Sequence, residues 1–224
     1  MQYKLIIFDL DDTLFDYNRT EQVAVEFACN QQGIPYSSNT YMKYKTANLT
    51  AKTRIKSYLR NLTKFRKMRV EVFFELLSFT NGDASKFVDD YLEYSKIGIM
   101  IDGVEETIPC LNVKKVVATN GSDIPRYNKF INSTIAPYFS AFYSSERLGS
   151  IKPDVMFYKK ILSEMGTSPS DALVVGNNFE TDILSALNCG LDVCWFNWKM
   201  EAVPEQYSKI KVIYQFQDLQ NIIG

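Results

Sequence analysis

The stretch LIIFDLDDTLFD, residues 5–16, joins a short apolar run to a cluster of acidic residues. The run from Leu5 to Phe8 has the length and composition of a buried β-strand. Because like charges this close repel one another, a counter-charge must offset the repulsion if the carboxylates stay ionised together. The acidic residues that follow the run are Asp9, Asp11, Asp12 and Asp16.

Similar apolar runs recur along the chain and predict further strands, at 3–8, 113–118, 139–143, 172–175 and 191–196. The segments 153–166 and 178–190 between the later runs have helical spacing and end in glycine, and the first opens with a proline in its first turn. Strands that alternate with helices predict a parallel sheet covered on both faces. The expected fold class is therefore α/β, with a doubly wound, Rossmann-like sheet.

Residues 17–100 interrupt this alternation, because they contain amphipathic helical patterns and no convincing strand. We interpret them as an all-helical domain inserted after the first strand. The α/β core then consists of residues 1–16 and 101–224.

Composition limits the classes of function. The 25 Lys and Arg residues nearly balance the 26 Asp and Glu residues, so no overall field favours nucleic acid or an anionic membrane as partner. No apolar stretch reaches the roughly 18 residues of a membrane span, and no leader pattern is seen. The four cysteines lack CxxC spacing, which fits free thiols in the cytoplasm. With no histidine, Ser-His-Asp and Cys-His catalysis are excluded.

Four short motifs follow the predicted strands: DLDDT at 9–13, TNGS at 119–122, SIKPD at 150–154 and GNNFETD at 176–182. In doubly wound sheets, ligands bind beyond the carboxyl ends of the strands. We therefore expect the four motifs to meet at one edge of the sheet.

In this order and spacing, the motifs resemble those of the haloacid dehalogenase-like (HAD) superfamily, whose members are mostly Mg²⁺-dependent phosphatases. The helical insertion resembles the cap of that superfamily. The resemblance implies that Asp9 attacks phosphorus and forms an aspartyl-phosphate, and that Asp11 is the general acid and base. It also implies that Lys152 neutralises the nucleophile and the phosphoryl oxygens.

Phosphate binding is expected from the Thr119 hydroxyl and the backbone amides of Asn120 and Gly121. Thr13 is expected to support the first loop.

The resemblance implies Mg²⁺ ligands at Asp9, Asp11, Asn177 and Asp182, with Asp11 contributing its carbonyl oxygen. We expect this divalent cation to neutralise the crowded carboxylates, so that they stay charged side by side. Asn177 departs from the family, which usually has aspartate at this position. An amide oxygen can still bind Mg²⁺, but the lost charge predicts weaker binding. Alternatively, Asn177 only caps the following helix.

The expected substrate is a small phosphorylated metabolite, either a nucleotide or a phosphorylated sugar. GLDVCWFNW, with TNG and SERLGSIKPD, resembles the pyrimidine 5′-nucleotidase branch. Cap aromatics Tyr41, Tyr44 and Tyr58 could stack on a base, although packing within the cap is favoured. Two other functions stay open: a phosphate-binding or regulatory protein on an inactive fold, suggested by Asn177, and a metal-free dehalogenase, disfavoured by Asp11.

Overall fold

The chain folds as two compact units, and the computed structural model describes residues 3–55, 61–120 and 123–223. The α/β unit comprises Met1–Tyr17 and Gly98–Gly224, and the helical unit comprises Asn18–Ile97. The predicted insertion, residues 17–100, begins one residue before the helical unit and ends three residues after it.

The α/β unit is built on one parallel sheet of six strands in the order β3-β2-β1-β4-β5-β6. The predicted doubly wound α/β fold is thus confirmed. All five predicted strands are present, whereas the sixth, only three residues long, was not predicted. The strands are β1 (Leu5–Phe8), β2 (Lys114–Thr119), β3 (Ala141–Ser144), β4 (Ala172–Gly176), β5 (Asp192–Phe196) and β6 (Lys211–Ile213).

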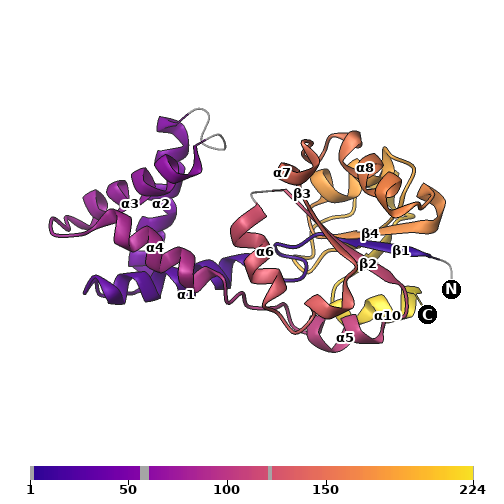
Figure 1. Ribbon diagram of the computed structural model, residues 1–224, viewed down its shortest axis with the longest axis horizontal. Helices are drawn as coiled ribbons and strands as arrows, with labels where there is room; N and C mark the ends of the chain where they lie inside the picture. The colour runs from indigo at the N-terminus through magenta and orange to yellow at the C-terminus, as the bar shows by residue number, and fades with distance from the viewer. Residues whose placement is uncertain (1–2, 56–60, 121–122, 224) are drawn as a thin grey trace. The chain divides into compact units, whose positions relative to one another are not determined.

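Both faces of the sheet are buried, which explains why β1 reads as continuously apolar. Ile6 and Phe8 point into one core cluster, and Leu5 and Ile7 into the other. Helices α5 (Val104–Cys110) and α10 (Leu219–Ile223) cover the first face, while α8 (Val155–Met165) and α9 (Ser185–Leu187) cover the second (Figure 1). This enclosure fixes the strand ends from which the site is built.

The other helices of the unit are α6 (Asp123–Ile131) and α7 (Ser145–Leu148). Short 3₁₀ turns lie at Ala136–Tyr138, Pro169–Asp171, Glu205–Tyr207 and Phe216–Asp218.

Two predicted helices differ in detail. The Asp154 carboxylate accepts a hydrogen bond from the Met156 N–H and caps α8, so Pro153 precedes the helix and does not lie in its first turn. The predicted helix 178–190 begins instead as a π-helical turn, Phe179–Leu184. The Asn178 carbonyl accepts from the N–H groups of both Asp182 and Ile183, which widens this turn.

The helical unit has its own apolar core. Tyr44 is fully buried there and contacts the ring of Phe73 edge to face, and Tyr41 also packs into this core. For these two tyrosines the interpretation as packing residues is confirmed, whereas Tyr58 lies outside the described residues. Among the described residues, no helix is both long and apolar enough to cross a membrane. The helices of this unit are α1 (Tyr17–Gln31), α2 (Ser38–Arg54), α3 (Leu62–Leu77) and α4 (Ala84–Ser95).

Candidate active site

The predicted motifs meet in a cavity of about 200 Å³ at the carboxyl ends of the strands. Asp9 follows β1, Thr119 ends β2, Asn177 follows β4, and Lys152 lies between α7 and α8. Gly121 lies outside the described residues, and every other predicted site residue lines the cavity. The lining residues are Asp9, Asp11, Asp12, Thr119, Asn120, Arg126, Lys152, Asn177, Asn178, Thr181 and Asp182.

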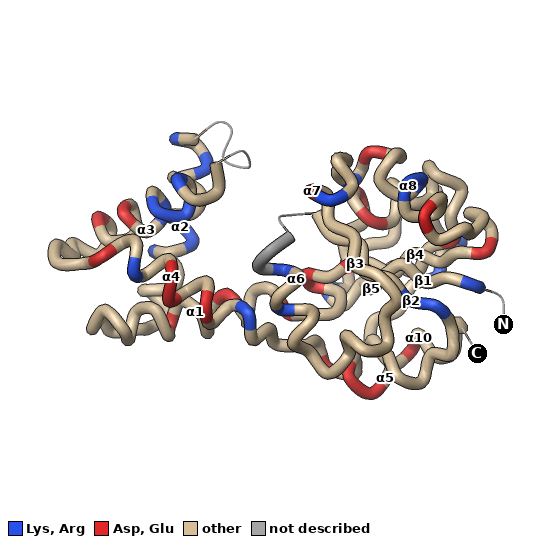
Figure 2. Tube along the Cα trace, in the orientation of Figure 1, with Lys and Arg blue, Asp and Glu red and all other residues tan. Residues whose placement is uncertain are grey.

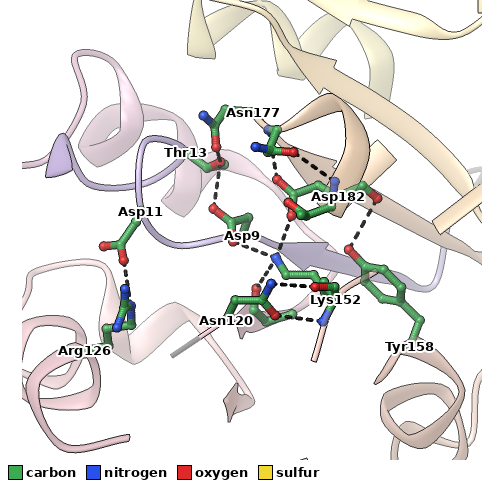
Figure 3. A network of polar contacts seen from close by, with 12 residues as sticks. Asp9, Asp11, Thr13, Asn120, Arg126, Lys152, Tyr158, Asn177 and Asp182 are labelled. Atoms are coloured by element: carbon green, nitrogen blue, oxygen red, sulfur yellow. Dashed lines mark hydrogen bonds and ion pairs between the residues drawn. The ribbon is translucent and has the colours of Figure 1, made fainter. Parts of the chain in front are cut away.

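Lys152 is the centre of the polar network (Figure 3). Its ammonium group donates to Asp9 Oδ1 at 2.7 Å, to Asp182 Oδ1 at 2.6 Å and to the Ala118 carbonyl at 3.1 Å. Burial alone would lower the pKa of this lysine, but the two carboxylates outweigh it and hold the pKa well above its ordinary value. The lysine therefore remains a fixed positive charge beside Asp9.

Asn120 positions the backbone of Lys152, a role that the sequence analysis missed. Its side-chain amide donates to the Lys152 carbonyl at 2.9 Å and accepts from the Lys152 N–H at 2.8 Å. An asparagine side chain can do both, since it carries a donor and an acceptor. The sequence shows that capacity but not the partner, which lies 32 residues away.

Asp9 has a polar neighbour at each carboxylate oxygen: Lys152 donates to Oδ1, and the Thr13 hydroxyl lies 3.2 Å from Oδ2. Burial and the charge of Asp182 raise the pKa of Asp9 to about 7, against the opposing effect of Lys152. A divalent cation beside Asp9 would favour its ionised form.

The donor set beside Thr13 fits a hard cation. The Thr13 hydroxyl lies 3.2 Å from Asp9 Oδ2 and 3.3 Å from Asn177 Oδ1, yet one hydroxyl carries a single proton. One of these oxygens therefore lacks a donor from Thr13, and carboxylate and amide oxygens are ligands that Mg²⁺ accepts. The described residues contain no group of three or more His, Cys, Asp or Glu side chains arranged for a metal, so a cation here would depend on Asn177 and backbone oxygens as well.

Asn177 does not cap the helical turn that follows it. Asn178, and not Asn177, accepts the N–H groups of Glu180 and Thr181 at the start of the π-helical turn, so the alternative that Asn177 caps this helix is wrong. The Asn177 carbonyl accepts from the Trp195 indole at 2.9 Å, which holds its backbone in place.

Gly176 is required by the close approach of Asp182. A Cβ atom at position 176 would lie 2.5 Å from the Cβ of Asp182 and 2.6 Å from its Oδ2. The absence of a side chain therefore lets Asp182 reach Lys152 while its Oδ2 accepts from the Asn178 N–H.

Asp11 is turned away from Asp9 and toward helix α6 (Figure 3). Arg126 Nε donates to its Oδ2 at 2.6 Å, and the Lys129 ammonium donates to its Oδ1 at 2.5 Å. Burial would raise the pKa of Asp11, but the charges of Lys129 and Arg126 outweigh it and hold the pKa well below the usual range. Neither cation was predicted from the sequence. Arg126 and Lys129 are three residues apart, about one helical turn. In the sequence, only this spacing indicated that they share one face of a helix.

Comparisons with known proteins identify the family of this chain. The family model described as haloacid dehalogenase-like hydrolase matches residues 6–196. Pyrimidine 5′-nucleotidase PynA of Streptococcus pneumoniae is 29% identical over 98% of this chain and 94% of its own. Glyceraldehyde 3-phosphate phosphatase of Methanothermobacter thermautotrophicus is 25% identical over 98% of this chain and 99% of its own. The magnesium-bound crystal structure of the HAD-hydrolase YfnB from Bacillus subtilis covers both chains completely with a TM-score of 0.82; at 23% identity, this likeness concerns the fold.

Proposed function

The chain belongs to the haloacid dehalogenase-like hydrolase family, and from this premise we propose that it is a Mg²⁺-dependent phosphatase acting on a small phosphomonoester. The observation that carries the proposal is the buried ammonium group of Lys152, bound to both Asp9 and Asp182 in a cavity that Thr119 also lines. A nucleophilic carboxylate beside a fixed cation suits a reaction in which negative charge gathers on phosphoryl oxygens.

In the proposed reaction, a carboxylate oxygen of Asp9 attacks phosphorus and the bond to the leaving oxygen breaks. Asp11 gives a proton to that oxygen, then takes one from the water that attacks the aspartyl-phosphate. The second attack breaks the bond between Asp9 and phosphorus and releases inorganic phosphate. Lys152 keeps its proton throughout and neutralises charge on the phosphoryl oxygens, while Thr119 and the backbone at Asn120 bind them.

Asp11 needs different surroundings for its two roles. Bound to Arg126 and Lys129 it is a carboxylate, the form that accepts a proton from water. To act as the acid it must leave these cations and carry a proton. The proposed reaction therefore includes a rearrangement of the Asp11 side chain.

A magnesium ion would be held by Asp9, Asn177, Asp182 and the Asp11 carbonyl oxygen. When bound, it would neutralise phosphoryl charge and hold the ester in line with the nucleophile. Thr13 would keep the Asp9 and Asn177 oxygens together on one side of the site.

The relatives suggest the substrate class. They are named for a pyrimidine nucleotide and for glyceraldehyde 3-phosphate, both small phosphomonoesters. We therefore propose a nucleotide or a phosphorylated sugar or related metabolite as the substrate. Acidic and basic residues are interspersed along the described part of the α/β unit (Figure 2), so the proposal includes no nucleic-acid substrate.

One observation favours a second function, phosphate binding without turnover. Asn177 supplies no charge, and the described residues form no ready group of three metal-binding side chains of the usual types. A protein with this site could hold phosphate through Lys152 and Thr119 but lack the metal needed for reaction.

Hydrolysis of p-nitrophenyl phosphate with and without Mg²⁺ tests the proposal. Wild-type protein should turn over only with Mg²⁺, and Asp9→Asn should lose activity by at least about 10³-fold, because an amide is a poor nucleophile. Asp89→Asn, at an exposed position on α4, is the matched control and should keep wild-type activity. Phosphate binding without hydrolysis would favour the second function. Chloride release from 2-chloropropionate without metal would indicate a dehalogenase.

A further inference from the structure

Arg126 lies in the candidate active site and holds the Asp11 carboxylate, but it meets no part of the substrate in the reaction described above. We propose that Arg126 binds a second anionic group on the leaving group of the substrate, so that the preferred phosphomonoester carries a carboxylate or another phosphate close to the ester. This inference rests on the proposed function, because it assigns a side of the cavity to the leaving group.

The two cations on Asp11 are not equivalent. The Lys129 side chain is 6% exposed, its ammonium lies 4.9 Å from the centre of the Phe15 ring, and its stem packs against Gly98. The Arg126 side chain is 29% exposed and lines the cavity. Lys129 is thus enclosed by protein, whereas Arg126 can reach a ligand.

The position of Arg126 identifies the part of the substrate that it meets. Asp11 must reach the leaving oxygen to protonate it, and Arg126 is hydrogen-bonded to Asp11. Lys152 binds Asp9 and Asp182, and so belongs to the side that holds the phosphoryl group. In the proposed reaction Asp11 turns from Arg126 toward the leaving oxygen, so Arg126 lies farther out on the leaving-group side of the same cavity.

The guanidinium group has unused capacity for an anion. It binds Asp11 through Nε, and its two terminal amino groups have no hydrogen-bond or ion-pair partner among the side chains that the structure describes. The planar fork of arginine matches the paired oxygens of a carboxylate or phosphate. An anion bound there would also take up part of the positive charge of Arg126, which would weaken one of the two contacts that hold the Asp11 side chain away from the leaving oxygen. A neutral leaving group would provide neither effect.

Two esters that differ mainly in this charge test the inference. Phosphoglycolate carries a carboxylate where ethyl phosphate carries a methyl group. With saturating Mg²⁺, we expect kcat/KM of the wild type to favour phosphoglycolate by about tenfold or more, as for a charge-assisted hydrogen bond. In Arg126→Gln this preference should fall to within about threefold of unity, while Arg126→Lys should keep part of it.

The two esters differ in intrinsic reactivity, but this difference is the same for every protein. It therefore cancels when the preference of the wild type is compared with that of a variant. Arg147→Gln is the matched control, because Arg147 binds Glu164 at the surface of the same unit, and it should keep the wild-type preference. Circular dichroism and thermal melting establish that each variant is folded. If Arg126→Gln were unfolded, Arg126→Lys and competitive inhibition by glycolate in the wild type would supply the same comparison.

The outcomes separate the two proposals. Hydrolysis of both esters with equal efficiency, or a preference that survives in Arg126→Gln, overturns the role of Arg126 and leaves the phosphatase function standing. Hydrolysis of neither ester and none of p-nitrophenyl phosphate overturns the phosphatase function and this inference with it, whereas hydrolysis of p-nitrophenyl phosphate alone overturns only the role of Arg126. A preference lost only at Arg126 supports both.

Discussion

Replacement of Asn177 by aspartate tests whether this position is a metal ligand. Asn177 Oδ1 and Asp9 Oδ2 both lie within hydrogen-bonding distance of the single Thr13 hydroxyl. The substitution nearly preserves shape and adds one negative charge beside a carboxylate that is already buried. Its effect should therefore have opposite signs with and without a divalent cation.

The magnitude follows from the geometry. Without metal, the new carboxylate and Asp9 Oδ2 lie at most about 6.5 Å apart, because both are next to the Thr13 hydroxyl, and they repel by about 2.5 kcal/mol or more at an effective dielectric constant of about 20. Lys152 offsets part of this repulsion, so we expect the free energy of unfolding to fall by about 1–2 kcal/mol. For a chain of this size we expect Tm to fall by about 2–8 °C. Because bound Mg²⁺ would relieve the same repulsion, linkage predicts that its affinity rises by about 5- to 30-fold.

Thermal melting in EDTA and calorimetric titration with Mg²⁺ measure the two effects. Asn178→Asp is the matched control, since it adds the same charge one residue away at a helix cap where aspartate and asparagine are equivalent. The control should show little change in either quantity. Activity at limiting Mg²⁺ should rise in Asn177→Asp and not in Asn178→Asp.

Equal Mg²⁺ affinity in wild type and Asn177→Asp would refute the assignment of Asn177 as a ligand. Equal gains in both variants would mean that the added charge acts only through the general field of the cavity.

Three further predictions concern stability and thiol chemistry. Lys152→Met leaves two buried carboxylates without their shared cation and should destabilise the protein by about 3–5 kcal/mol in urea unfolding, whereas Lys160→Met should cost less. Gly176→Ala places a methyl group against Asp182 and should lower both Tm and kcat; melting and turnover curves that match the wild type would contradict the packing argument. Burial raises the pKa of Cys194 to about 12, so this thiol should stay protonated and unreactive toward Ellman's reagent at pH 8. The exposed Cys110 should give a fast phase of reaction, and Cys110→Ser should remove that phase.

The fold could be predicted because its signals are local. The apolar run of β1 and the capped helix before Gly166 depend on neighbouring residues, and so does the order of strands and helices that implies a parallel sheet. The start of α8 was misplaced because both Pro153 and Asp154 are typical of helix beginnings, and only the hydrogen bond from Met156 distinguishes them. The π-helical turn depends on one carbonyl with two donors, which no sequence pattern specifies.

The candidate site was predicted less completely because its partners are remote in sequence. The motifs identify Asp9 and Lys152, and topology explains why they meet. The partners of Asp11 lie 115 and 118 residues away on α6, outside every motif. The motifs therefore contain the groups that react. The side chains that hold these groups in place come from other elements and cannot be identified from the motifs.

These remote partners also explain how the acidic cluster of the first loop persists. Lys152 offsets Asp9, and Arg126 and Lys129 offset Asp11, so each carboxylate of the proposed reaction faces a cation from another element. The repulsion within DLDD is therefore balanced by the protein, without a metal ion as the sole counter-charge. A bound metal would therefore contribute more to the reaction than to the stability of the fold. The positions of the three cations decide that Asp9 attacks and that Asp11 must move.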